Sequence, residues 1–290
     1  MFLLAISGGP DSMFMLNDQL KKHSNKNIIV AFVNYHQRDD SFIDQEIVTY
    51  FCEINNIKLE ILELKKEDYK KSNFQDWARI ERYNFFHKVY LENNCEKLLI
   101  AQHKDDYLET ALMQIKKGKI VNYYGIKEKS FLFGMNVERP YLFAYFKDEL
   151  EKINIKNNIK YAIDYTNNLD KYQRNIVRHL LQKKSKLWKN LMIIKFRLKN
   201  FILSIKQKRQ EKKYKFWEKK EFNQDVFKKM KNKEDLVYRY INDKFHNISL
   251  TKQKILSIVD FILSKKRTSK YLLKDNIFLE KEHGKLKDNV

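Results

Sequence analysis

The sequence predicts an α/β fold: a Rossmann-like parallel sheet with helices on both faces, followed by a smaller, mainly helical and basic C-terminal domain. Short apolar runs alternate with helical apolar spacing as far as Lys117, an order typical of parallel sheets. Polar loops follow the apolar runs, which is where open parallel sheets bind ligands. Beyond about residue 185 the spacing becomes helical throughout. We therefore expect an α/β domain over residues 1–185, a basic linker helix over 186–220 and a small helical domain over 221–290.

The first predicted strand, Phe2 to Ile6, leads into a loop that suits a bound phosphate. This loop consists of Ser7, Gly8, Gly9, Pro10, Asp11 and Ser12, and a helical pattern follows it. Glycines let a backbone approach an anion closely, and the first amides of a helix point at that anion with the positive end of the helix dipole behind them. We expect Asp11 or Ser12 to cap the helix. No lysine follows the turn, which separates it from the GxxxxGK[ST] loop of phosphoryl transfer.

The next elements continue the alternation of strand and helix. We predict strands at residues 28–33, 57–62 and 97–101, a helix from Ser41, and helices at 74–93 and 105–117. In such a sheet the segments 7–12, 34–41 and 101–106 all lie beyond the carboxyl ends of strands. They therefore form one predicted ligand site.

The C-terminal part has an apolar stripe at helical spacing, and we expect this stripe to face a core or to form one face of a linker helix. The stripe consists of Leu187, Leu191, Ile194, Leu198, Phe201 and Ile205. Fifteen Lys or Arg and only two acids lie from Lys183 to Lys220. The face opposite the stripe can therefore bind a phosphate backbone, or it can simply be exposed to solvent. We predict two or three short helices over 224–265, a hairpin about Asp275-Asn276, and a frayed end over 281–290.

Composition narrows the function classes. The formal charge of +21, from 58 Lys and Arg against 37 Asp and Glu, favours a polyanionic partner and above all nucleic acid, although lysine enrichment of the whole chain is an alternative explanation. The two cysteines, Cys52 and Cys95, form no CxxC pair, which argues against a disulfide framework, a zinc site or an iron–sulfur cluster. No apolar run reaches 18 residues, so we expect a cytoplasmic protein with no membrane association and infer no obligate protein partner.

Two clusters of charged residues are candidates for substrate binding. Asp106 and Glu109 are three apart, so on a helix both carboxylates project from one face and could bracket an ammonium group, whereas Asp105 points elsewhere. Acids in a first helical turn also stabilise the helix dipole, by about 0.3–1 kcal/mol each. Arg174 and Arg178 are one turn apart and could bind a carboxylate or phosphate as a fork, or pair structurally with Asp164.

Three longer motifs accompany the glycine loop. They are N-x-x-x-x-A-R-x-x-R-Y at residues 73–83, A-x-H-x-D-D-x-x-E-T at 101–110 and D-x-[ST]-N…Y-x-R-N-x-x-R at 164–178. Together with SGGPDS they resemble the tRNA(Ile)-lysidine synthase family of N-type ATP pyrophosphatases, from Phe2 to Arg178. The chain departs from the family pattern at Tyr35, His36 and Gln37 and at residues 117–120, so we assign His36 no role.

The resemblance implies a PP-loop ATPase fold and a two-step ligation. ATP would adenylate the C2 oxygen of the wobble cytidine in an isoleucine tRNA with the anticodon CAU, and free L-lysine would then expel AMP to give lysidine. It implies that residues 7–12 bind ATP, that Asp11 helps to hold Mg²⁺, and that Asp106 and Glu109 bind the lysine ammonium. Arg174 or Arg178 would bind the lysine carboxylate or tRNA phosphates. The attacking amine, with a pKa of about 10.4, must lose a proton, and Asp105 is the candidate base.

Other functions remain open at this point. A tRNA thiolase of the same loop class would activate the base in the same way but would need reactive cysteines, and Cys52 and Cys95 are poorly placed for that. A small-molecule amidotransferase or synthetase would not explain the charge of +21. A tRNA-binding module without catalysis need not keep both SGGPDS and the His103 to Thr110 motif.

Overall fold

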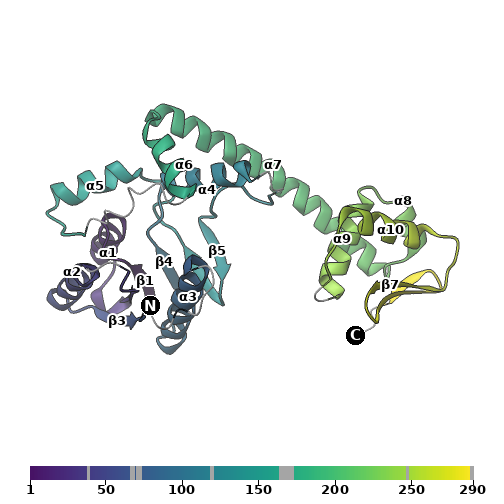
Figure 1. The fold of residues 1–290 in the computed structure, drawn as a ribbon, viewed down its shortest axis with the longest axis horizontal. Coiled ribbons are helices and arrows are strands. Elements are labelled where there is room, and N and C mark those ends of the chain that lie inside the picture. The colour runs from purple at the N-terminus through teal and green to yellow at the C-terminus, as the bar shows by residue number, and fades with distance from the viewer. Residues whose placement is uncertain are drawn as a thin grey trace. The chain divides into compact units, whose positions relative to one another are not determined.

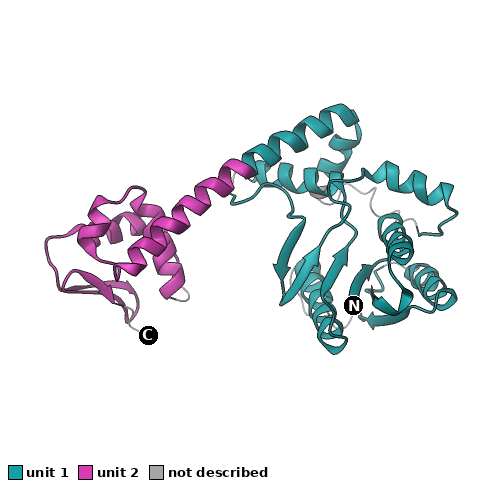
Figure 2. Cartoon of the chain, turned by 180° about the vertical axis from the view of Figure 1, so that it is seen from behind, with its two compact units in different colours: residues 1–200 teal, residues 201–290 magenta. Residues whose placement is uncertain are grey.

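The computed structural model describes residues 1–37, 40–65, 69, 74–117, 121–162, 173–245 and 248–287, and of residues 173–175 only the backbone. The chain divides into two compact units, Met1–Asn200 and Phe201–Val290 (Figure 2). Helix α7 (Lys186–Lys219) contributes to both units. No helix in the described ranges is long and apolar enough to cross a membrane.

The first unit is built on a six-stranded sheet in the order β3-β2-β1-β4-β6-β5 (Figure 1). The strands are β1 (Phe2–Ile6), β2 (Ile28–Asn34), β3 (Lys58–Glu63), β4 (Lys97–Ile100), β5 (Lys129–Leu132) and β6 (Met135–Glu138). All neighbours pair in parallel except β5, which runs antiparallel to β6. The chain builds outward from β1 to β3 and then returns to the other side of β1 with β4. The strand order therefore reverses between β1 and β4, the position where such sheets bind ligands.

Helices cover both faces of this sheet, which confirms the predicted fold class. They are α1 (Pro10–Lys22), α2 (Ser41–Ile54), α3 (Phe74–Glu92), α4 (Lys104–Lys116), α5 (Lys147–Lys156) and α6 (Gln173–Gln182), with a short 3-10 helix, η1 (Asn25–Asn27). Alternate residues of a strand face opposite sides, so Leu4 packs in a core with α1, α2 and α5 while Leu3 packs against α3. A further core joins α4, α6 and α7.

The apolar stripe, which was predicted to face a core or to form one face of a linker helix, lies mostly in solvent. Leu187 is 72% exposed and Leu198 is 60% exposed. Within the first unit, the buried face of α7 consists instead of Ile193, Phe196 and Asn200, which have the same helical spacing as the stripe. The core interpretation of the stripe was therefore wrong, because α7 carries two apolar rows and tertiary packing selects the shorter one.

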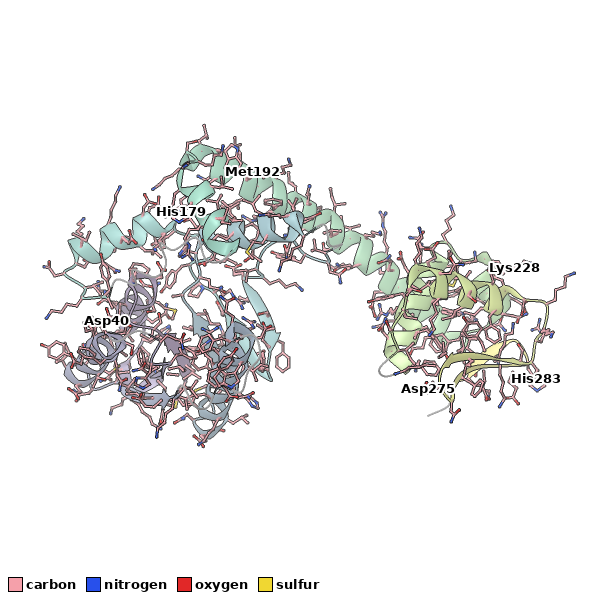
Figure 3. The ribbon with its side chains drawn as sticks, in the orientation of Figure 1. Asp40, His179, Met192, Lys228, Asp275 and His283 are labelled. Carbon is pink, nitrogen blue, oxygen red and sulfur yellow. The ribbon has the colours of Figure 1, made fainter. Side chains whose placement is uncertain are left out.

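The second unit combines helices with a small antiparallel sheet around the buried Trp217. Its remaining elements are α8 (Gln224–Lys229), α9 (Lys233–Lys244), α10 (Lys252–Leu263), β7 (Ser269–Lys274), β8 (Ile277–Glu282) and β9 (Lys285–Lys287). The predicted hairpin is confirmed as β7 and β8, and Figure 3 labels Asp275 and His283 at the two turns of the sheet. The predicted fraying was wrong for residues 281–287, because β9 pairs with β8 and the Lys281 ammonium donates to the backbone of Phe261.

Candidate active site

The loop after β1 has the geometry of an anion cradle. Gly8 has a φ of +80°, and a Cβ at this position would lie 2.9 Å from the Cβ of Asp44, so only glycine fits without strain. Gly9 precedes the helix and Pro10 opens it, without a side-chain cap. The predicted capping by Asp11 or Ser12 was therefore wrong. The Ser12 hydroxyl instead donates to the carbonyl of Gly9 and accepts the Ser7 amide, which ties the loop to itself.

A cavity of about 1050 Å³ opens at the carboxyl ends of β1, β2 and β4. It brings together the three segments that the sequence predicted to meet, and four residues of the glycine loop line it: Ser7, Gly9, Pro10 and Asp11. Acidic and basic side chains from α4, α5, α6 and α7, and from the segment between α6 and α7, also line the cavity. They are Asp105, Asp106, Glu109, Lys147, Asp148, Glu151, Arg178, Lys184, Lys186 and Lys189.

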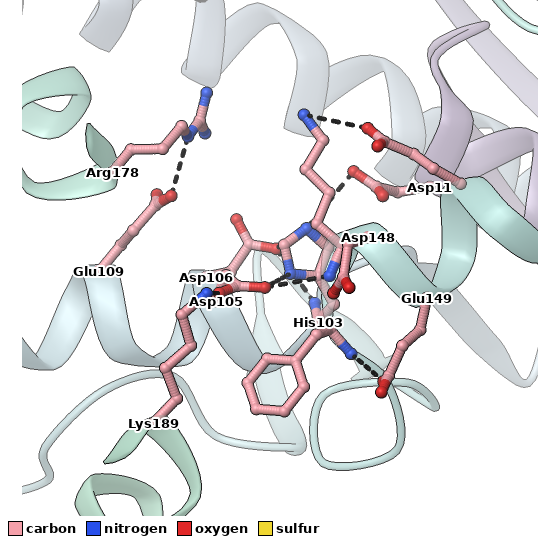
Figure 4. A network of polar contacts seen from close by, with 12 residues as sticks. Asp11, His103, Asp105, Asp106, Glu109, Asp148, Glu149, Arg178 and Lys189 are labelled. Carbon is pink, nitrogen blue, oxygen red and sulfur yellow. Dashed lines mark hydrogen bonds and ion pairs between the residues drawn. The ribbon is translucent and has the colours of Figure 1, made fainter. Parts of the chain in front are cut away.

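His103 lies among three carboxylates on the floor of this cavity (Figure 4). Its Nε2 is 3.3 Å from Oδ2 of Asp106 and 3.5 Å from Oδ2 of Asp11, and its Nδ1 is 3.7 Å from Oδ2 of Asp105. Burial disfavours the charged imidazole, but the carboxylates, led by Asp106, outweigh burial and raise the pKa of His103 to about 9. The cavity floor therefore carries an imidazolium cation at neutral pH. Sequence reasoning gave His103 little weight, because a lone histidine at a strand end is usually structural.

Asp105 anchors α7 to the site. Its Oδ1 accepts from Lys189 Nζ at 2.7 Å, and its Oδ2 accepts from the backbone amide of Lys147 at 3.0 Å. Burial alone would raise the pKa of this carboxyl, yet these two hydrogen bonds bring the pKa below its usual value. The sequence analysis missed Lys189, whose only signal is its spacing of four from the buried Ile193 of α7.

Glu109 and Arg178 form an ion pair between α4 and α6, with 2.8 Å from Nε of Arg178 to Oε1 of Glu109. Glu109 is 1% exposed. The predicted fork of two arginines can be followed only in part: the side chain of Arg174 and all of Asp164 lie outside the described residues, as do Asn73 and residues 118–120 of the sequence motifs. Both Asp106 and Glu109 line the cavity, as predicted, but Asp105 lines it as well, so the prediction that Asp105 points elsewhere was wrong.

Asp11 offers the one feature of the loop that fits a cation. Its Oδ1 is buried, and no hydrogen bond to it is found within the described residues. The described residues also contain no set of three or more His, Cys, Asp and Glu side chains arranged as metal ligands. Mg²⁺ commonly binds through one or two carboxylates together with substrate phosphates and water, so a single Asp11 beside a phosphate cradle fits this ion.

The cysteines lie away from this chemistry. Cys52 packs in the core under α1 and α2, and Cys95 packs in the core under α3. Burial raises the pKa of Cys52 to about 12 and also raises the pKa of Cys95, so both thiols stay protonated at neutral pH.

Comparison with known proteins gives one consistent result. Residues 1–185 match the PP-loop domain family. The tRNA(Ile)-lysidine synthase of Mesomycoplasma hyopneumoniae (strain 232) is 39% identical over 98% of this chain and 94% of that protein. The tRNA(Ile)-lysidine synthase of Mycoplasmopsis pulmonis (strain UAB CTIP) is 42% identical over 97% of this chain and 96% of that protein.

Among solved structures, the U34-tRNA thiolase NcsA from Methanococcus maripaludis is similar in fold. It has a TM-score of 0.54 and 20% sequence identity, and the match covers 70% of this chain and 72% of that one. At this identity the likeness concerns the fold alone.

Proposed function

Because the chain belongs to the tRNA(Ile)-lysidine synthase family, we propose that it ligates free L-lysine to C2 of the wobble cytidine, position 34, of an isoleucine tRNA with the anticodon CAU. The base oxygen attacks the α-phosphate of ATP and pyrophosphate leaves. The lysine amine then attacks C2 and expels AMP, so that lysidine reads AUA. With free lysine, ATP and tRNA as substrates, the proposed compartment is the cytoplasm.

One observation carries this proposal: a single cavity holds both the anion cradle and carboxylates suited to an amine. Ser7 and Asp11 of the cradle and Asp106 and Glu109 of α4 all line it, and Asp11 and Asp106 lie 3.5 Å and 3.3 Å from the same Nε2 of His103. A phosphate-activating site and an ammonium-binding site must adjoin if one enzyme is to adenylate a base and then aminate it. Both sites must lie within reach of the same cytidine base, because its C2 oxygen is adenylated and its C2 carbon is then attacked.

The glycine loop and the side chains beside it are proposed to bind the phosphates of ATP. The amides of Gly8, Gly9, Asp11 and Ser12 stabilise the negative charge of the departing pyrophosphate, with the dipole of α1 behind them, whereas Pro10 has no amide hydrogen and the Ser7 amide donates to the Ser12 hydroxyl. Asp11 would hold Mg²⁺, which supplies positive charge against the phosphate oxygens. His103, charged near neutral pH, lies 3.5 Å from Asp11 and adds a fixed positive charge beside the cradle.

The lysine substrate carries two ammonium groups and a carboxylate, and the acidic and basic side chains that line the cavity complement them. Asp106 and Glu109 are proposed to bind an ammonium group, and Arg178 the carboxylate. Arg174 keeps the role implied by its motif, as a partner for the lysine carboxylate or tRNA phosphates. The Glu109–Arg178 pair presents opposite charges 2.8 Å apart, an arrangement that suits a zwitterionic amino acid.

Asp105 is disfavoured as the base that takes the proton of the amine. Both of its oxygens already accept hydrogen bonds, from Lys189 and Lys147, and its pKa is lowered. His103 is also unsuited, because it is protonated at neutral pH. Of the three aspartates proposed for catalysis, Asp106 is the better candidate for proton transfer from the lysine.

A thiolase activity is disfavoured for a separate reason. Sulfur delivery needs a reactive thiolate, and Cys52 and Cys95 are buried in cores with raised pKa values. Neither of them lines the cavity.

The test is ligation of radiolabelled lysine. The protein is incubated with Mg-ATP, labelled lysine and an unmodified transcript of isoleucine tRNA with the anticodon CAU, and label that survives mild alkali is counted. Mild alkali removes aminoacyl esters but leaves lysidine. Surviving label is the expected result. Pyrophosphate release without surviving label would indicate a different nucleophile, and tight tRNA binding with neither signal would indicate a binding module without catalysis.

A further inference from the structure

Three arginines gather around one buried ring at the carboxyl edge of the sheet. Cζ of Arg79 lies 4.7 Å from the ring centroid of Tyr83, and Cζ of Arg82 lies 5.8 Å from it. Arg139, which follows β6, interacts electrostatically with both Tyr83 and Arg79. Tyr83 itself is 5% exposed, so the ring forms a fixed base for the three guanidinium groups. We call Arg79, Arg82 and Arg139 the arginine cluster.

The arginine cluster has no counter-ion among the described residues. Arg139 is 4% exposed, and its guanidinium donates to the Gln102 side chain, the carbonyl of Lys127 and the Ser130 hydroxyl, all of which are neutral. Neither Arg79 nor Arg82 pairs with a carboxylate in the described ranges. Holding three like charges together, one of them buried, costs free energy that a bound anion would offset.

The cluster adjoins the cavity. Tyr35 lines the cavity, its hydroxyl donates to the carbonyl of Ala78 on α3 at 3.2 Å, and it interacts with Arg82. Gln102, which contacts Arg139, directly precedes His103 on the cavity floor. The Tyr35 side chain thus lies between the cavity and the cluster, while Arg79 is exposed and opens the cluster to solvent.

We propose that the arginine cluster binds a backbone phosphate of single-stranded RNA, beside the nucleotide whose base enters the cavity. The proposal rests on the proposed function, because it takes the RNA to be the tRNA substrate. A target base must leave its stack to reach the cavity, and this turns the adjoining phosphates toward the protein. Guanidinium groups bind phosphate oxygens in bidentate fashion, and Arg79 and Arg82, held against a rigid ring, preorganise such a site, while the buried Arg139 adds positive charge to it.

The test compares Arg79→Gln with Lys88→Gln in the full chain. Both changes remove one positive charge from α3, but Lys88 is remote from the cluster and pairs with Glu92 on its own helix. Arg79 is exposed, so its replacement should leave the fold intact, which circular dichroism would verify. The dissociation constant of unmodified tRNA is measured from 50 to 200 mM salt without ATP or lysine. Ethylation interference then maps the contacted phosphates.

We expect Arg79→Gln to weaken tRNA binding about tenfold. The slope of log K against log salt should become less steep by the amount that corresponds to about one lost phosphate contact. Ethylation interference should disappear at one phosphate next to position 34. Lys88→Gln should match the unaltered protein. Unchanged affinity and interference in Arg79→Gln would overturn the proposal. Weaker ATP binding with unchanged tRNA binding would also overturn it, since the anion would then be the nucleotide. Because binding is measured without turnover, absence of lysidine would refute the proposed function and leave this result standing.

Discussion

Arg178 on α6 donates from Nε to Oε1 of Glu109 on α4 across 2.8 Å. The sequence predicted two separate contacts for a lysine substrate, one from each residue, and the structure places the two side chains on each other. The pair therefore has a structural part, holding α6 against α4, in addition to any contact with substrate. A change in activity after substitution of Glu109 or Arg178 alone would therefore combine the loss of the contact between helices with the loss of any contact with substrate.

Arg178→Gln leaves the buried Glu109 carboxylate without the charge of Arg178. Because Arg178 is 22% exposed, we expect a loss of ~2–3 kcal/mol of unfolding free energy, below the about 3–5 kcal/mol of a fully buried pair. The double variant Glu109→Gln/Arg178→Gln should lose less than the sum of the single losses. Urea denaturation measures all three variants, and additive losses would contradict an energetic coupling of the pair.

Asp106→Asn should abolish transfer of lysine while tRNA binding is preserved. Asp106 lines the cavity and accepts the backbone amide of His103, a contact that the asparagine oxygen can keep. The change therefore removes the charge opposite the lysine ammonium but retains the start of α4. Labelled-lysine transfer and tRNA affinity are measured side by side. Unchanged turnover would exclude Asp106 from the site.

Gly8→Ala and Gly9→Ala separate backbone strain from phosphate binding. Alanine at residue 8 would have a φ of +80° and a Cβ 2.9 Å from Asp44, so we expect a stability loss of ~1–3 kcal/mol. Alanine at residue 9 would meet only the Ser7 hydroxyl, at 3.7 Å, but its Cβ stands in the loop that lines the cavity. We expect near-normal stability with weaker ATP binding, measured by thermal unfolding and calorimetry. Equal stabilities of the two variants would contradict the strain at Gly8.

His103 predicts a pH-dependent contribution to stability. Its pKa is about 9 in the folded protein and near 6.5 when unfolded, so the charged imidazole stabilises the fold fully below pH 6.5 and loses this effect as the pH rises through about 9. The stability difference between the unaltered protein and His103→Gln should fall by ~3 kcal/mol between pH 6 and 10. His283→Asn is the control, because His283 is exposed at a turn with φ of +49°, which asparagine tolerates. A flat difference would mean that folding does not shift the pKa of His103.

Binding of tRNA should depend strongly on salt. If six to ten phosphates are contacted, the affinity should fall by about 10³–10⁵ between 50 and 200 mM salt. Replacing Lys206, Lys208 and Lys212, which are exposed on α7, by glutamine should flatten this dependence. Filter binding at several salt concentrations measures it. A dissociation constant that does not change with salt would refute a role for these lysines of α7 in binding tRNA.

Most of the first unit could be predicted because β1, β2 and β4 are mainly apolar and β3 largely alternates polar and apolar residues. The β5–β6 hairpin was missed, since β5 is a four-residue edge strand whose Phe131 is 70% exposed, and no apolar run marks it. Helix α5 was also missed, because its sequence, KDELEKINIK, is too polar to show a clear apolar face.

The candidate site, like the fold, could be predicted from the sequence only in part. The positions of Asp11, Asp106 and Glu109 at one edge of the sheet came from the order of strands and loops. The pairing of Asp105 with Lys189 did not, because it depends on how α7 packs, and the more conspicuous apolar row of α7 turned out to face solvent. Spacing along a helix gives faces, and only tertiary contacts decide which of two similar faces is buried.

The reactivity of the two cysteines can report on local opening of the first unit, Met1–Asn200. Cys52 lies in the core on the α1 face of the sheet and Cys95 in the core on the α3 face. Both thiols are shielded and protonated in the folded state, so a labelling reagent can reach each one only when its own core opens. The relative labelling rates of Cys52 and Cys95 would therefore show which of the two cores opens first, without any added probe.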